Sequence, residues 1–307
     1  MRSVLGALVV AVGVVSGGPL QAQSAPSAEQ QALGAAISKS NAVIALMNRT
    51  LRAVESWTRY TSWVNLKTGP TGRERYIDYG LYGLYDVRGE IAKARAAAGQ
   101  PPFAAELDAT VLRYVAAYEA LAPLLTAANG YYERKDYKSD KMAEGKLLHE
   151  KMVPAAQAFL AERAAIERHM QVFKSDIDKR ALAAIEAEEG RSARWHVKNV
   201  MVEAGRMMQL MPSNAAPVVD LARYDERLAG YAAAVKELDL FAEAYPGKFS
   251  AFEGQPRSLL GKLRDLRDKL GRAKGDARRG GGGDLTWIVN EYNMMVSSSE
   301  MATRFGR

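Results

Sequence analysis

Three carboxylates recur at four-residue steps near the middle of the chain and are the first candidates for chemistry. On one continuous helix, Asp136, Asp140 and Glu144 would stack on a single face and repel one another. A turn between Tyr137 and Lys141, a cover of neighbouring lysines, or a bound cation would each relieve that repulsion. The turn is physically simplest, since an aspartate can accept backbone N–H bonds and cap the next helix. No spacing here matches a known metal-ligand loop, so we predict a structural turn and no metal site.

The carboxylates belong to a stretch, residues 131–149, whose composition is the most unusual in the chain. Its tyrosines, lysines and terminal histidine permit two interpretations. One is the structural turn; the other is a binding site for a small molecule, a glycan or a metal. The residues that would form either the structural signature or the ligand site are Tyr131, Tyr132, Asp136, Tyr137, Asp140, Lys141 and His149.

The usual catalytic signatures are absent from the sequence. No pair among the three histidines has helical ligand spacing, no serine sits in a GxSxG motif, and no cysteine is available as a nucleophile. Glu189, His196 and Glu203 recur every seven residues, but a partly exposed histidine between acids is the simpler interpretation. The glycines at 280–283 lack the flanking strand and Lys-Ser/Thr of a phosphate loop. We predict no catalytic residue, no cofactor and no enzymatic activity.

The beginning of the chain predicts export. Arg2 precedes an apolar run over residues 4–15, and small residues at 22–25 offer a cleavage site. The run is too short to span a bilayer, which takes about 20 apolar residues. We expect a signal peptide over 1–24, a disordered linker over 25–32, and a periplasmic protein. Because the chain contains no cysteine, it has no disulfide and no residue that would carry a lipid anchor.

The charge of the chain is moderately basic, with 42 lysines and arginines against 35 acidic residues. Both signs are interleaved nearly everywhere, which is typical of solvated helix faces. Attraction to anionic envelope surfaces is the alternative. No basic stripe stands out and the protein is expected outside the cytoplasm, so nucleic acid is excluded as a partner.

Helical periodicity dominates the chain after residue 33. Apolar residues recur at three- and four-residue steps, valine and isoleucine are sparse, and no alternating strand pattern occurs. We predict an all-α protein, an elongated multi-helix bundle with no sheet. It would be a single domain over 33–307 that can bend near 136–140. The clearest helices are expected over residues 35–67, 73–98, 103–132, 142–189, 192–211, 218–244, 256–274 and 285–303.

Tyrosines recur at every third position of the second predicted helix, at Tyr76, Tyr79, Tyr82 and Tyr85. In a helix, steps of three drift backward by about 60° each, so the rings would form a spiralling stripe. Core tyrosines with hydroxyls at the rim are the favoured interpretation. An aromatic surface for sugars or peptides is the alternative.

Three segments, spread over nearly the whole chain after the signal peptide, carry a resemblance to a known family. Residues 41–48 (NAVIALMN) are similar to its opening Asn-x-Tyr-Ile-x-x-x-Asn, with Val43 in place of tyrosine, and 291–295 (EYNMM) resemble its closing Tyr-Asn-x-Leu-Ile. The most specific match lies at Tyr131, Tyr132, Lys135, Asp136, Tyr137, Lys138, Asp140, Lys141, Gly145, Lys146, Leu148 and His149. By these segments the chain resembles the YiiG-like bacterial envelope family, a domain of unknown function.

The resemblance implies a helical protein of the cell envelope and no established activity. Relatives are often lipoproteins, but this chain lacks the lipid-bearing cysteine, which favours a soluble periplasmic form. The leading hypothesis is a non-enzymatic protein that binds an unidentified envelope partner or ligand along its helical surface. The alternative is a periplasmic binder of a small molecule, glycan or metal that uses residues 131–149. The sequence leaves the oligomeric state open.

Overall fold

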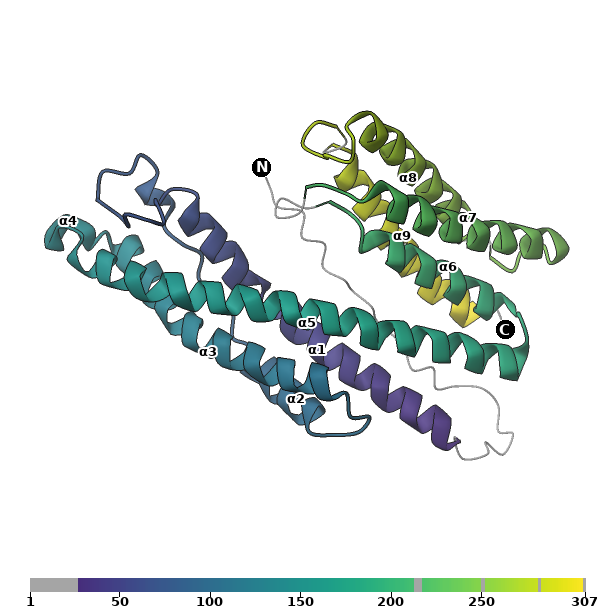
Figure 1. Ribbon diagram of the computed structural model, residues 1–307. Coiled ribbons are helices and arrows are strands. Elements are labelled where there is room, and N and C mark those ends of the chain that lie inside the picture. Colours follow the sequence, from purple (N-terminus) through teal and green to yellow (C-terminus); the bar gives the residue numbers. More distant parts are fainter. Residues whose placement is uncertain (1–26, 213–216, 250–251, 281–282, 306–307) are drawn as a thin grey trace. The chain divides into compact units, whose positions relative to one another are not determined.

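The computed structural model describes residues 27–212, 217–249, 252–280 and 283–305, and throughout these ranges the regular structure is helical (Figure 1). The described residues contain no strand beyond an isolated bridge between Val218 and Asp276. The predicted all-α class is therefore confirmed. The signal peptide expected over 1–24 lies outside the described residues.

The chain divides into two compact units, Ala25–Ile177 and a second unit that includes Asp178–Arg307. The division falls inside a single long helix, α5 (Ala143–Glu189), which runs through Pro154 without a break. The single helical domain expected over 33–307 stays a prediction. None of the helices in the described ranges combines the length and apolarity that crossing a membrane requires.

The first unit begins earlier than the sequence pattern indicated. Helix α1 spans Ala28–Thr61, so the linker expected over 25–32 is wrong from Ala28 onward. The cause is local, because Ser27 and Gln30 form a reciprocal capping box that satisfies two exposed amides of the first turn. The sequence pattern places these polar residues in a linker because the apolar periodicity of the helix starts only after residue 33.

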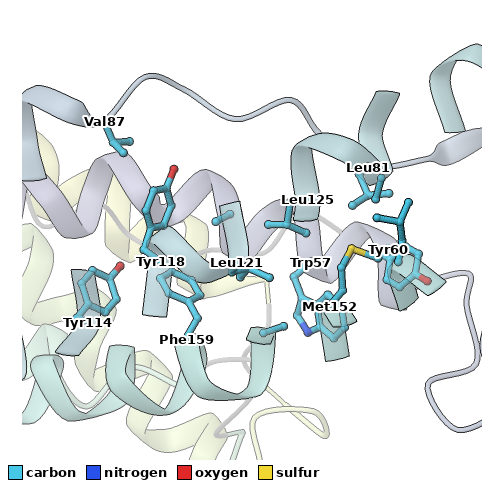
Figure 2. Packing of buried hydrophobic residues seen from close by; sticks show 14 of the residues in the cluster. Trp57, Tyr60, Leu81, Val87, Tyr114, Tyr118, Leu121, Leu125, Met152 and Phe159 are labelled. Atoms are coloured by element: carbon cyan, nitrogen blue, oxygen red, sulfur yellow. The ribbon is translucent and has the colours of Figure 1, made fainter. Parts of the chain in front are cut away.

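Four helices build the core of the first unit. Helix α1 packs on α2 (Arg88–Ala98) and α3 (Ala105–Arg134), α2 packs on α3, and the first part of α5 completes the cluster. Figure 2 shows part of this core, in which side chains of α1, α3 and α5 pack together with Leu81 and Val87. Its labelled members include Trp57, Tyr60, Tyr114, Tyr118, Leu121, Leu125, Met152 and Phe159.

The helix expected over 73–98 is wrong for its first half. The chain there forms one 3-10 turn, η1 (Ile77–Tyr79), followed by an extended segment over 80–87. Leu81 and Val87 are buried in the core and Leu84 packs against it, so every third side chain faces inward. The same spacing had indicated a spiralling helix.

Side chains of α1 hold the extended segment in place. Ser56 Oγ accepts from the amide of Tyr82 at 3.2 Å and donates to its carbonyl at 3.0 Å. Three arginines donate Nε–H to further carbonyls: Arg49 to Asp86 at 3.1 Å, Arg52 to Gly83 at 3.2 Å and Arg59 to Tyr79 at 2.5 Å. Backbone groups that a helix would satisfy internally are thus satisfied by another element.

The second unit is a bundle of four helices that follows the end of α5. Helix α6 (Ala193–Met208) packs on α7 (Leu221–Ala244), α7 on α8 (Gly254–Arg272), α8 on α9 (Asp284–Phe305), and α9 returns to α6. Ser192 caps α6 and Asp220 caps α7 through side-chain acceptors. The buried hydroxyls of its core tyrosines find backbone partners: Tyr224 donates to Leu263 O at 2.9 Å and Tyr231 to Pro256 O at 3.0 Å.

Alanine substitution of two leucines in α3, one buried and one exposed, tests which face of this helix packs in the core. Leu121 is fully buried whereas Leu112 is 49% exposed. Leu121→Ala is expected to lower the free energy of unfolding by about 2–5 kcal/mol because it leaves a cavity, and Leu112→Ala by less than about 0.5 kcal/mol. Denaturant unfolding followed by circular dichroism measures both, and equal losses would contradict this face of α3.

Candidate functional site

The three carboxylates sit at a sharp reversal between α3 and α5. Lys135, Lys141 and Met142 have positive φ angles of 59°, 55° and 70°, and between them lies a single helical turn, α4 (Tyr137–Asp140). Left-handed residues end a helix, so no continuous helix stacks the carboxylates. The turn predicted between Tyr137 and Lys141 is present.

Asp140 organises the start of α5. Its carboxylate accepts from the amide of Met142 at 2.8 Å and from the amide of Glu144 at 2.9 Å, so it caps the helix that follows. A third donor, the Tyr131 hydroxyl at the end of α3, reaches it at 2.8 Å. One side chain therefore ties the end of one helix to the beginning of the next, as the sequence predicts for an aspartate cap at this position.

Hydrogen bonding sets the protonation of this carboxylate. Burial disfavours the ionised form of Asp140, but the Glu144 amide, the Tyr131 hydroxyl and the Met142 amide all donate to it and together hold its pKa below the ordinary 3.8. The carboxylate is consequently ionised at neutral pH, with donors from both neighbouring helices.

Asp136 has a different role from Asp140. It makes no capping bond and instead accepts from the guanidinium of Arg134, at 2.9 Å from Nε and 2.6 Å from the terminal nitrogen. The neighbouring Lys135 pairs across to Asp78 of η1 at 3.0 Å, and the Tyr137 hydroxyl donates to the same carboxylate at 3.2 Å. The turn is thereby fastened to the loop that precedes the extended segment.

The two adjacent tyrosines of the signature are core residues. Tyr131 is fully buried and Tyr132 is 3% exposed, and both hydroxyls approach the sulfur of Met142, at 3.6 and 3.9 Å. Their rings meet edge to face with centroids 5.1 Å apart, and Tyr132 also packs edge to face on Trp63 at 5.0 Å. Nothing about these side chains is open to solvent.

His149 closes the same cluster from α5. Its Nε2 lies 3.2 Å from the carbonyl of Leu66 and its Nδ1 lies 2.9 Å from the hydroxyl of Tyr60. Because a carbonyl can only accept, Nε2 carries the proton and Nδ1 accepts from the tyrosine. The histidine is buried, and both its nitrogens are used by groups of α1 and of the chain just after it.

The structure brings most of the signature into one cluster, which we call the aromatic hub: Tyr60, Trp63, Tyr131, Tyr132, Tyr137, Met142 and His149. Asp140 adjoins the hub through the Tyr131 hydroxyl, whereas Asp136 pairs with Arg134 and Lys141 has an exposed side chain. Sequence reasoning missed Tyr60, Trp63 and Met142 as hub members. The aromatic residues at the end of the first predicted helix were the available signal.

The chemistry of the hub is that of a packed core. Burial raises the pKa values of Tyr60, Tyr131 and Tyr132 far above neutrality, and the Asp140 carboxylate raises that of Tyr131 further. These hydroxyls are therefore neutral donors at physiological pH. Over the described ranges, no three His, Asp or Glu side chains gather as metal ligands would.

The seven-residue spacing of Glu189, His196 and Glu203 forms no shared arrangement. Glu189 accepts from Ser192 at 2.8 Å and from Arg194 at 2.7 Å, while Glu203 pairs with Arg206. The expectation that His196 is partly exposed is wrong, because its side chain is only 7% exposed. Its ring lies 4.7 Å from that of Phe241 and 5.1 Å from that of Trp195, and burial lowers its pKa.

A second feature lies on the surface of the first unit, where the tyrosines of the extended segment stack with arginines of α1. The tyrosine–arginine column consists, in spatial order, of Arg49, Tyr85, Arg52, Tyr82, Arg59 and Tyr79. Guanidinium carbons lie 4.0 to 5.7 Å from the ring centroids. The interpretation of these tyrosines as core residues is wrong, since Tyr79 and Tyr85 are each 50% exposed.

The chain matches a protein family along most of its length. The family is described as "Protein of unknown function (DUF3829)", and the match covers residues 35–298. The "Uncharacterized protein YiiG" of Escherichia coli (strain K12) is 28% identical over 256 residues, which span 78% of this chain and 71% of that protein. No solved structure matches significantly. These findings confirm the resemblance carried by the three sequence segments.

Gly145 tests the packing of the hub. A Cβ atom there would overlap the sulfur of Met142 and lie 3.0 Å from a ring carbon of Tyr131. Gly145→Ala is expected to lower the free energy of unfolding by about 1–3 kcal/mol through overpacking. Gly89→Ala in α2 is the matched control, because nothing lies within 4 Å of its Cβ and a gain of up to about 1 kcal/mol is expected. Denaturant unfolding compares them; an unaffected Gly145 variant would contradict the hub packing.

The pH dependence of stability tests Asp140. Since its pKa is depressed by folding, its contribution is fully present above the ordinary pKa of 3.8 and is lost as pH falls through the native value. Asp140→Asn should therefore be less stable than wild type by a constant margin at higher pH, and the margin should shrink below pH 3.8. Thermal unfolding across this range measures it. Glu144→Gln, which removes an exposed carboxylate one turn away, is the control. Its stability difference from wild type should not show the change below pH 3.8 that is expected for Asp140→Asn.

Proposed function

The chain belongs to the DUF3829 family, and on that premise we propose that it is an exported, non-enzymatic protein of the bacterial cell envelope that acts by binding a partner. The observation that carries the proposal is the internal use of the signature. The polar atoms of Asp140, Tyr131 and His149 form hydrogen bonds with groups of the neighbouring helices and loops. The segment that is most specific to the family resemblance thus stabilises the fold.

The electrostatics of the signature support a non-catalytic role. A general acid or base works best with a pKa near the operating pH. Here the pKa values of Tyr131 and Tyr132 are raised and that of Asp140 is lowered, so all three move away from neutrality. The side chains also face one another in a buried cluster rather than a site that a substrate can enter.

Export is supported by the sequence at the start of the chain. Arg2, the apolar run over 4–15 and the small residues at 22–25 have the order and length of a cleavable secretory signal. With no cysteine to carry a lipid, the processed protein would be free in the periplasm. A protein in that compartment with an exposed aromatic and cationic surface is suited to binding other envelope components.

A combined experiment tests the role of the signature. Asp140→Ala removes the cap of α5, so its thermal midpoint is expected to fall by several degrees. Native mass spectrometry of wild type and variant, each purified gently from the periplasm, should show the polypeptide mass alone. Asp136→Ala, which removes a more exposed ion pair with Arg134, is the matched control and should change the midpoint less.

The opposite pattern would favour the ligand-site interpretation of 131–149. It would consist of an additional mass on the wild-type protein that disappears in Asp140→Ala while the thermal midpoint stays unchanged. Export is checked in the same preparations, because a processed chain that begins within residues 22–26 should fractionate with periplasmic markers. Retention of the unprocessed chain in the cytoplasm would contradict the proposed location.

A further inference from the structure

The tyrosine–arginine column has more cationic groups than salt-bridge partners. Arg52 pairs with Glu55 at 2.9 Å, and Asp86, whose carboxylate interacts electrostatically with Arg49, is bound by Arg88 at 2.6 Å. Within the described ranges, neither Arg49 nor Arg59 forms a salt bridge. Their Nε atoms bind backbone carbonyls, which fixes the guanidinium planes while the terminal nitrogens remain available.

Stacking determines which atoms of the column meet a partner. Tyr82 has the guanidinium carbons of Arg52 and Arg59 over its ring at 4.0 and 4.3 Å. Those arginines are separated by two turns of α1, about 10 Å, so the ring lies between them. The aromatic faces are therefore covered, and what points outward is the phenolic edges together with guanidinium N–H groups.

Such a surface is a row of hydrogen-bond donors with positive charge, and it fits oxygen anions. Arginine binds carboxylates in its plane, and a guanidinium held by stacking and by a backbone carbonyl is already oriented for this. Covered ring faces do not suit sugars, which stack on open aromatic faces, and they offer little apolar area for insertion among lipid chains. Acidic side chains on a protein remain the best match.

The spacing of the column indicates the shape of that partner. The guanidinium carbons of Arg52 and Arg59 lie 4.0 and 4.3 Å from the Tyr82 centroid, and those of Arg49 and Arg52 lie 4.6 and 5.6 Å from the Tyr85 centroid. Neighbouring guanidinium groups are therefore no more than about 8 to 10 Å apart, and three residues of a partner chain in a threefold extended conformation advance about 9 Å. Each step contains one guanidinium between two rings. An extended peptide with an acidic residue at every third position has the same repeat, so successive carboxylates would meet successive arginines.

We propose that the tyrosine–arginine column binds an extended acidic segment of a partner protein, with acidic residues at every third position. The inference rests on the proposed binding function and names the partner's chemistry, and it is independent of export. Arg49, Arg52 and Arg59 bind the carboxylates, and two hydroxyls add donors, that of Tyr85 between Arg49 and Arg52 and that of Tyr79 beyond Arg59. Tyr76, whose ring stacks on Tyr79 at 5.1 Å, extends the same surface toward Arg75.

Fluorescence anisotropy with the purified chain tests the proposal. The probe is a labelled peptide of repeated Glu-Pro-Pro triplets, and its control contains the same residues with all glutamates in one block. The triplet peptide should bind roughly tenfold more tightly than the block peptide, and the affinity should fall with added salt. Equal affinity for both peptides, or no binding of the triplet peptide, overturns the proposal.

Variants assign the binding to the column. Arg49→Gln combined with Arg59→Gln should weaken the triplet peptide by roughly tenfold or more. Arg95→Gln combined with Arg113→Gln removes the same charge elsewhere on the unit and should change affinity less than about twofold. Equal losses of affinity in the two double variants would show that only net charge matters and would contradict binding at the column.

A conservative variant guards against misfolding of the first double variant. Tyr79→Phe with Tyr85→Phe keeps both rings and removes two exposed hydroxyls, so the fold should be unchanged by circular dichroism and affinity for the triplet peptide should drop a few-fold.

Two other anionic partners are tested in the same way: vesicles that contain phosphatidylglycerol, and the anionic glycan polygalacturonate. Tighter binding of either than of the triplet peptide, lost in the arginine variant, would replace the proposed partner. Whatever these titrations show, export is decided separately by the fractionation.

Discussion

The carboxylate of Asp140 is the interaction on which the first unit depends most. It meets the exposed amides at the start of α5 and the hydroxyl of Tyr131 at the end of α3, and so defines the reversal between these two helices. Three residues with positive φ make this reversal costly for the backbone by itself. A charged acceptor with donors on both sides offsets that cost, and the aromatic hub packs around the result.

The hub also explains how distant parts of the chain are joined. His149 connects α5 to α1 through Tyr60 and Leu66, and Asp78 connects the turn to η1 through Lys135 and Tyr137. The His149 contacts use polar atoms that would otherwise be stranded near a hydrophobic core, whereas Lys135 and Asp78 form an ion pair at the surface, with side chains 48% and 69% exposed. A family signature rich in tyrosine, aspartate and histidine therefore need not denote catalysis, because the same residue types are what a buried polar junction requires.

The surface column shows the opposite use of similar residues. Tyr79 and Tyr85 are half exposed, and the neighbouring arginines of α1 donate to backbone carbonyls, Arg52 alone among them also pairing with an acid in the described ranges. The arrangement arises because the inward positions of the same segment, Leu81 and Val87, are committed to the core. The three-residue repeat thus anchors the segment in the core on one side and places tyrosines against the arginines of α1 on the other.

Sequence by itself determined the features that are encoded within one or two helical turns. Apolar periodicity identified most of the helices, and the spacing of Asp136, Asp140 and Glu144 identified the turn, because like charges at four-residue steps and an aspartate cap act locally. Tertiary structure alone decided the conformation of residues 80–87. Tyrosines three apart fit a spiralling helix or a non-helical segment equally well, and the non-helical conformation is stabilised by arginines of α1 that lie 31 to 37 residues earlier. The partners of His149 were likewise invisible in the sequence, since Tyr60 and Leu66 precede it by 89 and 83 residues and only folding brings them within hydrogen-bonding distance.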